Sequence, residues 1–430
     1  MTETRETRFA LPEPRIGAGS GGTARGRTGT GGRGSLPSPA DVGGAAIFAP
    51  ARLGPLTLRN RIIKAATFEG SSPKGAVTER LIDYHRRVAE GGAALSTVAY
   101  LAVSPEGRTD RHCIHLNGES ANALLAVTDA IHGAGALASA QIGHAGPVAD
   151  GRSNGAPVLG PSRSFSPFGT PIHGVSEADI ERITGYYRQA AALAVEAGFD
   201  CLEVHLGHNY LLSAFLSPKL NRRADRYGGD LEARARFPRQ VVQAVREGAG
   251  TGVAVTAKLN MDDGVPGGFW VDESVVFARM LADDGALDAL ELTGGSSLAN
   301  PMYLFRGDAP RREFAATLPG PLRLGFKAIG RRFMPDYPFE EAYFLPLARQ
   351  FLGAVDLPLI LLGGINRLAT IEAALGEGFA FVAMARALLR EPDLPNRMAA
   401  GEAAESRCIH CNKCMPTIRS GTRCVLVEPA

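Results

Sequence analysis

The chain has 430 residues, of which 45% are hydrophobic, and its 46 basic and 44 acidic side chains leave a formal net charge of only +2. The hydrophobic content is enough for a large core, which excludes a chain that is disordered throughout. The balanced charge gives no reason to expect a nucleic acid or a membrane as a partner. No apolar run approaches the ~18 residues of a membrane span, and the N-terminus has no secretory signal, so we expect a cytoplasmic protein.

The N-terminal residues 1–44 are rich in Gly, Ser, Thr, Pro and Arg and contain almost no large apolar side chain. Such a segment cannot bury enough surface to offset the entropy of ordering, so we predict a disordered arm. The folded part is therefore expected to begin at residue 45.

From residue 45 to about residue 400, short apolar segments alternate with amphipathic helical patterns. Strands are predicted for residues 61–68, 94–100, 136–143, 201–207, 253–260, 287–295, 358–364 and 379–386. Helical patterns between them include residues 119–133, 177–197, 231–247, 273–283, 339–352 and 368–376. Eight β/α units at these spacings predict the α/β class and a closed (β/α)8 TIM barrel, rather than a doubly wound sheet with fewer strands. The long connection at residues 303–343 is expected to form a cap over a site.

Glycines and an arginine follow the last two predicted strands. Gly363 and Gly364 come after the seventh strand, and Ala385 and Arg386 come after the eighth. Barrels commonly bind phosphate at this place, because glycine lets backbone N–H groups approach and arginine adds charge-assisted hydrogen bonds. On position alone, a tight turn with an arginine paired on the surface explains these residues equally well.

The most informative segment follows the fourth predicted strand. His205, His208 and Tyr210 fall where that strand gives way to its loop, which in a parallel barrel is the catalytic rim. The surrounding sequence, EVHLGHNYLLSAFLSPKLNRRADRYGG, resembles the signature of the Old Yellow Enzyme family of FMN-dependent ene-reductases. In that signature, E-x-H-x-x-[NH]-x-Y-L leads into F-L-S-P-x-x-N-x-R-x-D-x-Y-G-G. The resemblance covers roughly residues 46–424 and implies an FMN-binding barrel with NAD(P)H as its reductant.

The resemblance also implies the flavin contacts. It places Ala65, Ala66 and Thr67 along the flavin, with Thr67 as a donor to the O4 edge, and Gln141 at the pyrimidine edge. Lys258 stands where many members have an arginine near N1, and a fixed cation there stabilises the negative charge that two-electron reduction creates. The two loops after the seventh and eighth strands are implied to hold the phosphate, although the family often has glycine at position 385.

The same resemblance implies the chemistry of the rim. His205 and His208 donate hydrogen bonds to the carbonyl oxygen of an enone, and Tyr210, protonated because its ordinary pKa is about 10, gives a proton to the α carbon. Two histidines near Glu203 would also suit a metal-dependent barrel hydrolase. Against that alternative, the ends of the first, third and fifth strands offer few further ligands.

The C-terminal residues 401–430 contain a tight cysteine run, in which Cys408, Cys411, Cys414 and Cys424 are spaced C-x2-C-x2-C-x9-C. This run favours a [4Fe–4S] cluster over the paired knuckles of most zinc sites, with zinc and free thiols as alternatives. It resembles the cluster segment of the 2,4-dienoyl-CoA reductase, enoate reductase and trimethylamine dehydrogenase branch. Nucleotide-binding domains follow that segment in the branch but not here, so a cluster in this chain would be vestigial, structural or supplied with electrons by a separate electron-transfer protein.

We therefore expect an FMN-dependent oxidoreductase that passes hydride from NAD(P)H to the activated C=C bond of an α,β-unsaturated carbonyl compound, so that an enone or enoyl compound is the substrate. A flavin-dependent amine dehydrogenase or N-demethylase is the main alternative, since it shares the barrel and the cluster. An inactive barrel that serves as an interaction platform is disfavoured, because every expected flavin position is filled. A homo-oligomer is compatible with the sequence.

Overall fold

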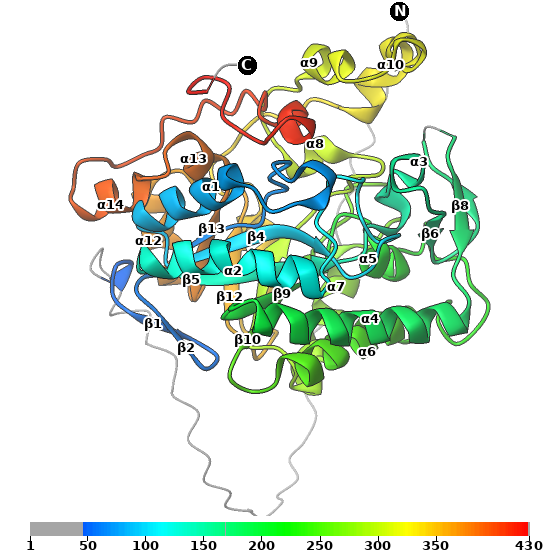
Figure 1. Cartoon of the computed structure of the whole chain (residues 1–430), viewed down its shortest axis with the longest axis horizontal. Helices are drawn as coiled ribbons and strands as arrows, with labels where there is room; N and C mark the ends of the chain where they lie inside the picture. Colours follow the sequence, from blue (N-terminus) through cyan, green and yellow to red (C-terminus); the bar gives the residue numbers. More distant parts are fainter. Residues whose placement is uncertain (1–45, 168, 429–430) are drawn as a thin grey trace, which may run out of the picture. The chain divides into compact units, whose positions relative to one another are not determined.

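The computed structural model describes residues 46–167 and 169–428, and the predicted arm at residues 1–44 lies outside them. Eight parallel strands close a barrel in the described part (Figure 1). They pair in chain order, and the last closes on the first with Val382 opposite Ile62. The prediction of a (β/α)8 barrel with these eight strands is confirmed. The strands are β3 (Ile62–Lys64), β4 (Leu95–Ala102), β5 (Leu137–Gly143), β9 (Cys201–Leu206), β10 (Ala254–Asn260), β11 (Ala289–Thr293), β12 (Leu359–Leu362) and β13 (Phe381–Met384).

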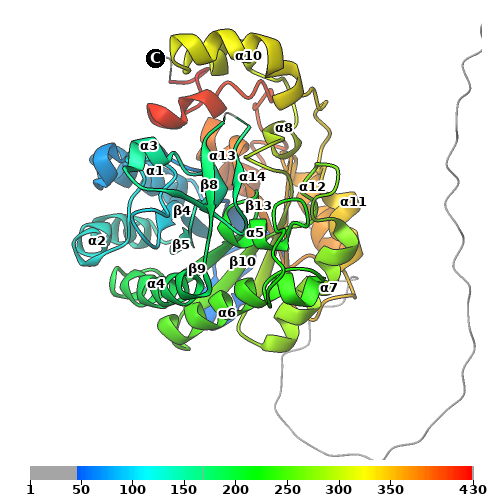
Figure 2. The ribbon, with the colours of Figure 1, turned by 90° about the vertical axis from the view of Figure 1, so that its right-hand side faces the viewer.

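Helices connect the strands and surround the barrel (Figure 2). Side-chain caps fix where several of them begin: Asn117 and Ser176 form capping boxes, and Asp230 accepts from the backbone N–H of Ala233. The longer helices are α1 (Glu79–Glu90), α2 (Gly118–Gly133), α4 (Glu177–Glu196), α6 (Leu231–Ala249), α7 (Val271–Asp284) and α12 (Leu368–Glu377). Shorter ones are α3 (Gly151–Asn154), α5 (Leu211–Leu216), α13 (Arg386–Arg390) and α14 (Leu394–Ala399).

Two small sheets accompany the barrel. The hairpin of β1 (Ala51–Leu53) and β2 (Leu56–Leu58) precedes it, and β6 (Val158–Gly160), β7 (Ser164–Phe165) and β8 (Pro171–Gly174) form a sheet before α4. The barrel strands themselves are buried on both faces, as parallel strands covered by helices must be; every residue of β4 and β10 is buried. None of the helices that the structure describes combines the length and the apolar character needed to cross a membrane.

The predicted helix at residues 339–352 is wrong for most of its length. Only α11 (Leu345–Ala348) and a 3₁₀ turn at Arg349–Phe351 are helical. Ala342 has a left-handed φ of 52°, through which a helix does not continue, and the Tyr343 hydroxyl donates to the Leu304 carbonyl. The apolar spacing in this segment reflects packing over the barrel rather than one helical face.

The connection between β11 and β12 carries α8 (Pro301–Leu304), α9 (Arg311–Ala316) and α10 (Gly320–Phe333). We call residues 301–344 the insertion. The apolar side chains of α9 and α10 contribute to a cluster separate from the barrel core, which includes Phe326, Phe333 and Met334, whereas Tyr343 and Phe344 at the end of the insertion belong to the barrel core. The C-terminal segment lies beside the insertion in both views (Figures 1 and 2), and Met415 of that segment packs against the same cluster.

Candidate active site

A cavity of about 440 Å³ opens among the loops that follow the barrel strands. Its walls come from the ends of seven barrel strands, from the insertion and from the C-terminal segment. All the residues predicted for the flavin and for the chemistry line this one cavity: Ala65, Ala66, Thr67, Gln141, His205, His208, Tyr210, Lys258, Gly363, Gly364, Ala385 and Arg386. The structure therefore brings together side chains that lie far apart in the sequence.

Two imidazoles and a phenol form one side of the cavity. The ring centroids of His205 and His208 are 5.0 Å apart, and those of His205 and Tyr210 are 4.5 Å apart in an edge-on arrangement. His208 is held by Thr293, whose Oγ1 lies 3.0 Å from Nε2, and by Asn260, which accepts from the His208 backbone N–H. Nδ1 of His205 is buried and has no hydrogen-bond partner among the described residues. An orphaned polar atom on a cavity wall is suited to bind a ligand.

Burial determines the protonation of this group. It lowers the pKa of His208 to about 3, with a smaller contribution from the charge of Lys258. It lowers the pKa of His205 well below the usual value, with His208 and Lys258 adding to the effect. Burial also raises the pKa of Tyr210. Near pH 7 the two imidazoles are therefore neutral and the phenol keeps its proton, so these three side chains are able to donate hydrogen bonds without carrying charge.

Lys258, the predicted cation near N1, is held by two glutamates that were not predicted as partners. Its Nζ lies 3.2 Å from Oε2 of Glu203 and also contacts Oε1 of Glu291. Gln141 donates from Nε2 to the other oxygen of Glu203 at 2.7 Å, and all four side chains are buried. The register of the sheet explains the set, since Lys258 on β10 lies opposite Glu291 on β11. Burial raises the pKa of Glu291 to about 7 although Lys258 opposes this, so the carboxyl is partly protonated at neutral pH.

The turn after β12 accepts only glycine. Gly363 and Gly364 have φ values of 108° and 75°, which other L-residues rarely adopt. A Cβ on Gly363 would lie 2.5 Å from Cδ2 of Phe344, and one on Gly364 would lie 2.7 Å from Cδ1 of Tyr343. Glycine at both positions therefore lets this turn pack directly against Phe344 and Tyr343, and both glycines and Arg386 line the cavity.

The four tail cysteines line a second, smaller pocket. Arg386 and Cys414 line both this pocket and the rim cavity, so the two pockets adjoin. None of the four cysteines forms a disulfide. Within the described residues, no group of three or more His, Cys, Asp or Glu side chains is placed to hold a single metal ion. The fold thus gathers the four cysteines around one pocket.

A buried polar network behind Thr67 was also missed. Nζ of Lys64 lies 3.1 Å from Oε1 of Glu69, and Nε2 of His85 lies 3.3 Å from the same oxygen. The ammonium also lies over the ring of Tyr84, whose hydroxyl is 3.4 Å from Oγ1 of Thr67. The available signal was a lysine that ends an otherwise apolar strand, because such a side chain needs a buried partner.

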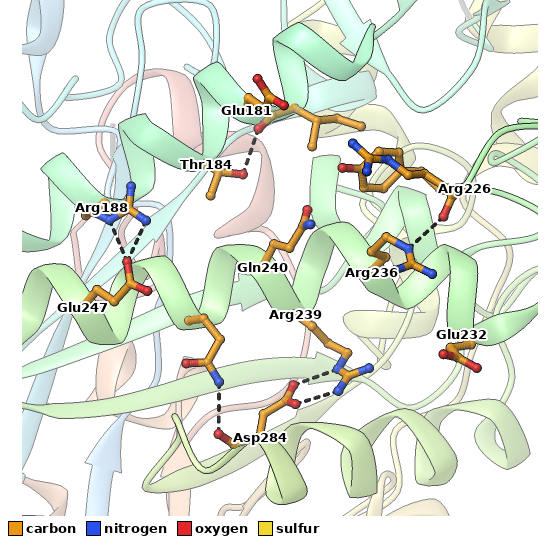
Figure 3. A pocket seen from close by; sticks show the side chains of 13 residues that line it. Glu181, Thr184, Arg188, Arg226, Glu232, Arg236, Arg239, Gln240, Glu247 and Asp284 are labelled. Atoms are coloured by element: carbon orange, nitrogen blue, oxygen red, sulfur yellow. Dashed lines mark hydrogen bonds and ion pairs between the residues drawn. The ribbon is translucent and has the colours of Figure 1, made fainter.

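A groove of about 570 Å³ lies elsewhere, on α4 and α6 (Figure 3). Four of its charged side chains form two ion pairs: Nη2 of Arg188 lies 2.6 Å from Oε2 of Glu247, and Nη2 of Arg239 lies 2.6 Å from Oδ1 of Asp284. None of the predicted site residues lines it. Ion pairing accounts for this groove, and we place the chemistry in the cavity at the rim.

Comparison with known proteins identifies the family. The profile of the NADH:flavin oxidoreductase / NADH oxidase family matches residues 46–292. The chain belongs to this family. It is therefore an NADH-dependent flavin oxidoreductase, and the prediction of an Old Yellow Enzyme-like enzyme is confirmed.

Individual relatives of this flavin oxidoreductase differ in length and in acceptor. The 4,4'-dithiodibutanoate disulfide reductase of Rhodococcus erythropolis is 57% identical over 88% of this chain and 94% of its own length. Two other curated relatives are longer, and the chain spans 51% and 52% of their lengths. A solved 2-naphthoyl-CoA reductase matches with a TM-score of 0.77 at 23% identity, over 89% of this chain and 57% of its own. An Old Yellow Enzyme homologue from Zymomonas mobilis matches with a TM-score of 0.68 at 23% identity, over 85% and 96% of the two chains.

Proposed function

We propose that this flavin oxidoreductase binds FMN in the rim cavity and reduces the activated C=C bond of an α,β-unsaturated carbonyl compound. The observation that carries the proposal is the position of His205, His208 and Tyr210 on one side of a cavity whose other walls suit a flavin. The glycine turn after β12 and Arg386 fit a phosphate, and Lys258 fits the N1 region. When bound, FMN supplies hydride obtained from NADH or NADPH.

The protein's own groups act on the acceptor. His205 and His208 are neutral donors, so they bind the carbonyl oxygen and stabilise the negative charge that it gains as an enolate. Tyr210 gives its proton to the α carbon and regains one from solvent. The contact between His208 and Thr293 fixes that imidazole ring, which reduces the reorganisation needed during the reaction. Phe314 and other aromatic side chains of the insertion line the cavity and limit the entry of water.

A small organic disulfide is the second candidate acceptor. It is supported by the relative that is 57% identical and is matched over 94% of its length, because that protein is a disulfide reductase. Hydride added to one sulfur forms an S–H bond, breaks the S–S bond and releases the other sulfur as a thiolate. Tyr210 is placed to protonate that thiolate, so one NAD(P)H and one proton yield two thiols. The same acid would serve both acceptors.

We also propose that the tail binds a [4Fe–4S] cluster. Each iron of such a cluster takes one thiolate, and the four cysteines around one pocket supply the four thiolates that it needs. Cys414 borders the rim cavity as well, which supports a cluster that would lie beside the flavin. A separate electron-transfer protein is the proposed external partner of the cluster.

The test combines steady-state and stopped-flow kinetics on purified protein with NADH, 2-cyclohexenone and 4,4'-dithiodibutanoate. We expect Tyr210→Phe to slow reduction of the preferred acceptor by about 10² or more, while reduction of the flavin by NADH changes little. Tyr186→Phe, on α4 and outside the cavity, is the matched control. Turnover of the disulfide alone would favour the second candidate, and equal slowing of both half-reactions by Tyr210→Phe would overturn the role of this acid.

A further inference from the structure

One asparagine of the cysteine run joins that run to two other parts of the site. Oδ1 of Asn412 accepts a hydrogen bond from Nη1 of Arg386, 26 positions away in the sequence. Nδ2 of Asn412 donates to the backbone carbonyls of Phe305 and Asp308 in the insertion, the latter at 3.0 Å. The side chain is only 2% exposed. One amide group therefore connects the cysteine run, the phosphate arginine and the insertion.

The backbone around Asn412 is shaped for this contact. Asn412 and His410 have left-handed φ values of 53° and 56°, a conformation that asparagine tolerates better than most residues. The insertion meets the run at Gly307, where an added Cβ would lie 2.2 Å from the His410 carbonyl oxygen. The Asp308 backbone N–H donates to that oxygen at 3.1 Å, and the His410 ring stacks on Phe339 at 3.4 Å. The run is thus docked closely on the insertion.

Arg386 receives its orientation from neutral acceptors. Its Nη1 donates to the Arg306 carbonyl at 2.8 Å as well as to Asn412, and it forms no salt bridge within the described part of the chain. An amide or carbonyl oxygen directs a guanidinium without neutralising its charge, whereas a carboxylate in the same place would compete with an anionic ligand. The positive charge of Arg386 consequently remains available on the cavity wall.

We propose that Asn412 is a positioning residue that holds Arg386 for the phosphate of FMN and ties that contact to the cysteine run. This inference rests on the proposed FMN site. If Asn412 has this role, the contact between Arg386 and the FMN phosphate depends on residue 412, whereas the contacts with the flavin ring do not. Riboflavin has the same ring as FMN but no phosphate. A comparison of the two ligands therefore distinguishes a role of Asn412 in phosphate binding from a general role in the structure.

The experiment removes the flavin from the full-length protein and measures the dissociation constants of FMN and riboflavin by fluorescence quenching. We expect Asn412→Ala to weaken FMN binding by about tenfold to a hundredfold, the size of one hydrogen bond to a charged group, and to leave riboflavin binding unchanged. Asn412→Asp keeps the shape of the side chain, but its carboxylate neutralises the charge of Arg386. This substitution should therefore weaken FMN binding at least as much as Asn412→Ala does. Lys413→Ala is the control, because this neighbouring side chain is exposed and pairs with Glu313.

Three outcomes overturn the inference. Asn412→Ala weakens the binding of FMN and riboflavin equally, it weakens the binding of neither, or Lys413→Ala weakens FMN binding by the same factor. Arg386→Ala separates this failure from failure of the proposed function. If the wild type prefers FMN and Arg386→Ala removes that preference while Asn412→Ala keeps it, only the role of Asn412 is wrong. If the wild type binds the two flavins equally and Arg386→Ala changes nothing, the phosphate site itself is wrong.

Discussion

Replacing Lys258 with methionine should destabilise the protein in a pH-dependent way, because two buried carboxylates lose their cation. The side chains of Glu203 and Glu291 are 4% and 2% exposed, and both contact the ammonium. Methionine has a similar length and flexibility, so the packing changes little. Removal of one partner from a buried ion pair costs about 3–5 kcal/mol. We expect the free energy of unfolding to fall by about this amount at pH 8.

Lowering the pH should reduce this loss in the free energy of unfolding. Burial raises the pKa of Glu291 to about 7, and Lys258 opposes that rise, so the pKa of Glu291 increases further in the variant. A carboxyl with a higher pKa in the folded state costs stability fully above that pKa, and the cost disappears below the unfolded value of about 4.3. The deficit of Lys258→Met should therefore be small at pH 5 and should grow as the pH rises through 7.

Urea unfolding of the wild type and the variant, followed by circular dichroism at pH 5 and pH 8, measures both effects. The double variant Lys258→Met/Glu291→Leu should recover part of the stability at pH 8, since one of the two uncompensated carboxylates is gone. Lys219→Met, an exposed substitution, controls for loss of a lysine. An equal deficit at both pH values, or none at pH 8, would refute the assignment of Lys258 as the cation of this buried set.

Three further results are expected. Gly363→Ala should lower the flavin content of purified protein and its thermal midpoint, because the new Cβ meets Phe344 at 2.5 Å; Gly376→Ala, a helical position with no atom within 4 Å of the added Cβ, should leave both intact. Cys411→Ser should remove about four irons per chain from anaerobically prepared protein while flavin remains bound, and zinc in the wild type would contradict the cluster. Burial lowers the pKa of His208 to about 3, so the rate of acceptor reduction should show no imidazole titration between pH 5 and 8; a break near pH 6.5 would show that a charged histidine takes part.

The sequence was sufficient to predict the barrel, and every residue that it predicted for the flavin and the chemistry lines the cavity, although most of the other lining residues were not predicted. Parallel strands that are buried on both faces appear in the sequence as continuous apolar runs, and the rim motif is one continuous segment. The strands and the motif can therefore be recognised from the sequence alone. The helix at residues 339–352 failed because apolar spacing also arises where a non-helical segment packs on a barrel, as around Ala342. The partners of Lys258 are set by strand register, and those of Asn412 are set by the docking of the C-terminal segment on the insertion. Neither the register nor the docking produces a local pattern in the sequence.

The cavity has walls of two kinds, and this division bears on how the enzyme can be engineered. The strand ends carry the groups that we propose for hydride and proton transfer, whereas apolar side chains of the insertion and of the C-terminal segment, among them Phe314, Phe333 and Met415, border the remaining space. The apolar side chains of α9 and α10 belong to a cluster outside the barrel core, so substitutions in these two helices do not alter that core directly. Libraries that seek a new acceptor should therefore vary the cavity-facing positions of α9 and α10 and keep the rim constant. Selectivity and reactivity can then be optimised in separate rounds.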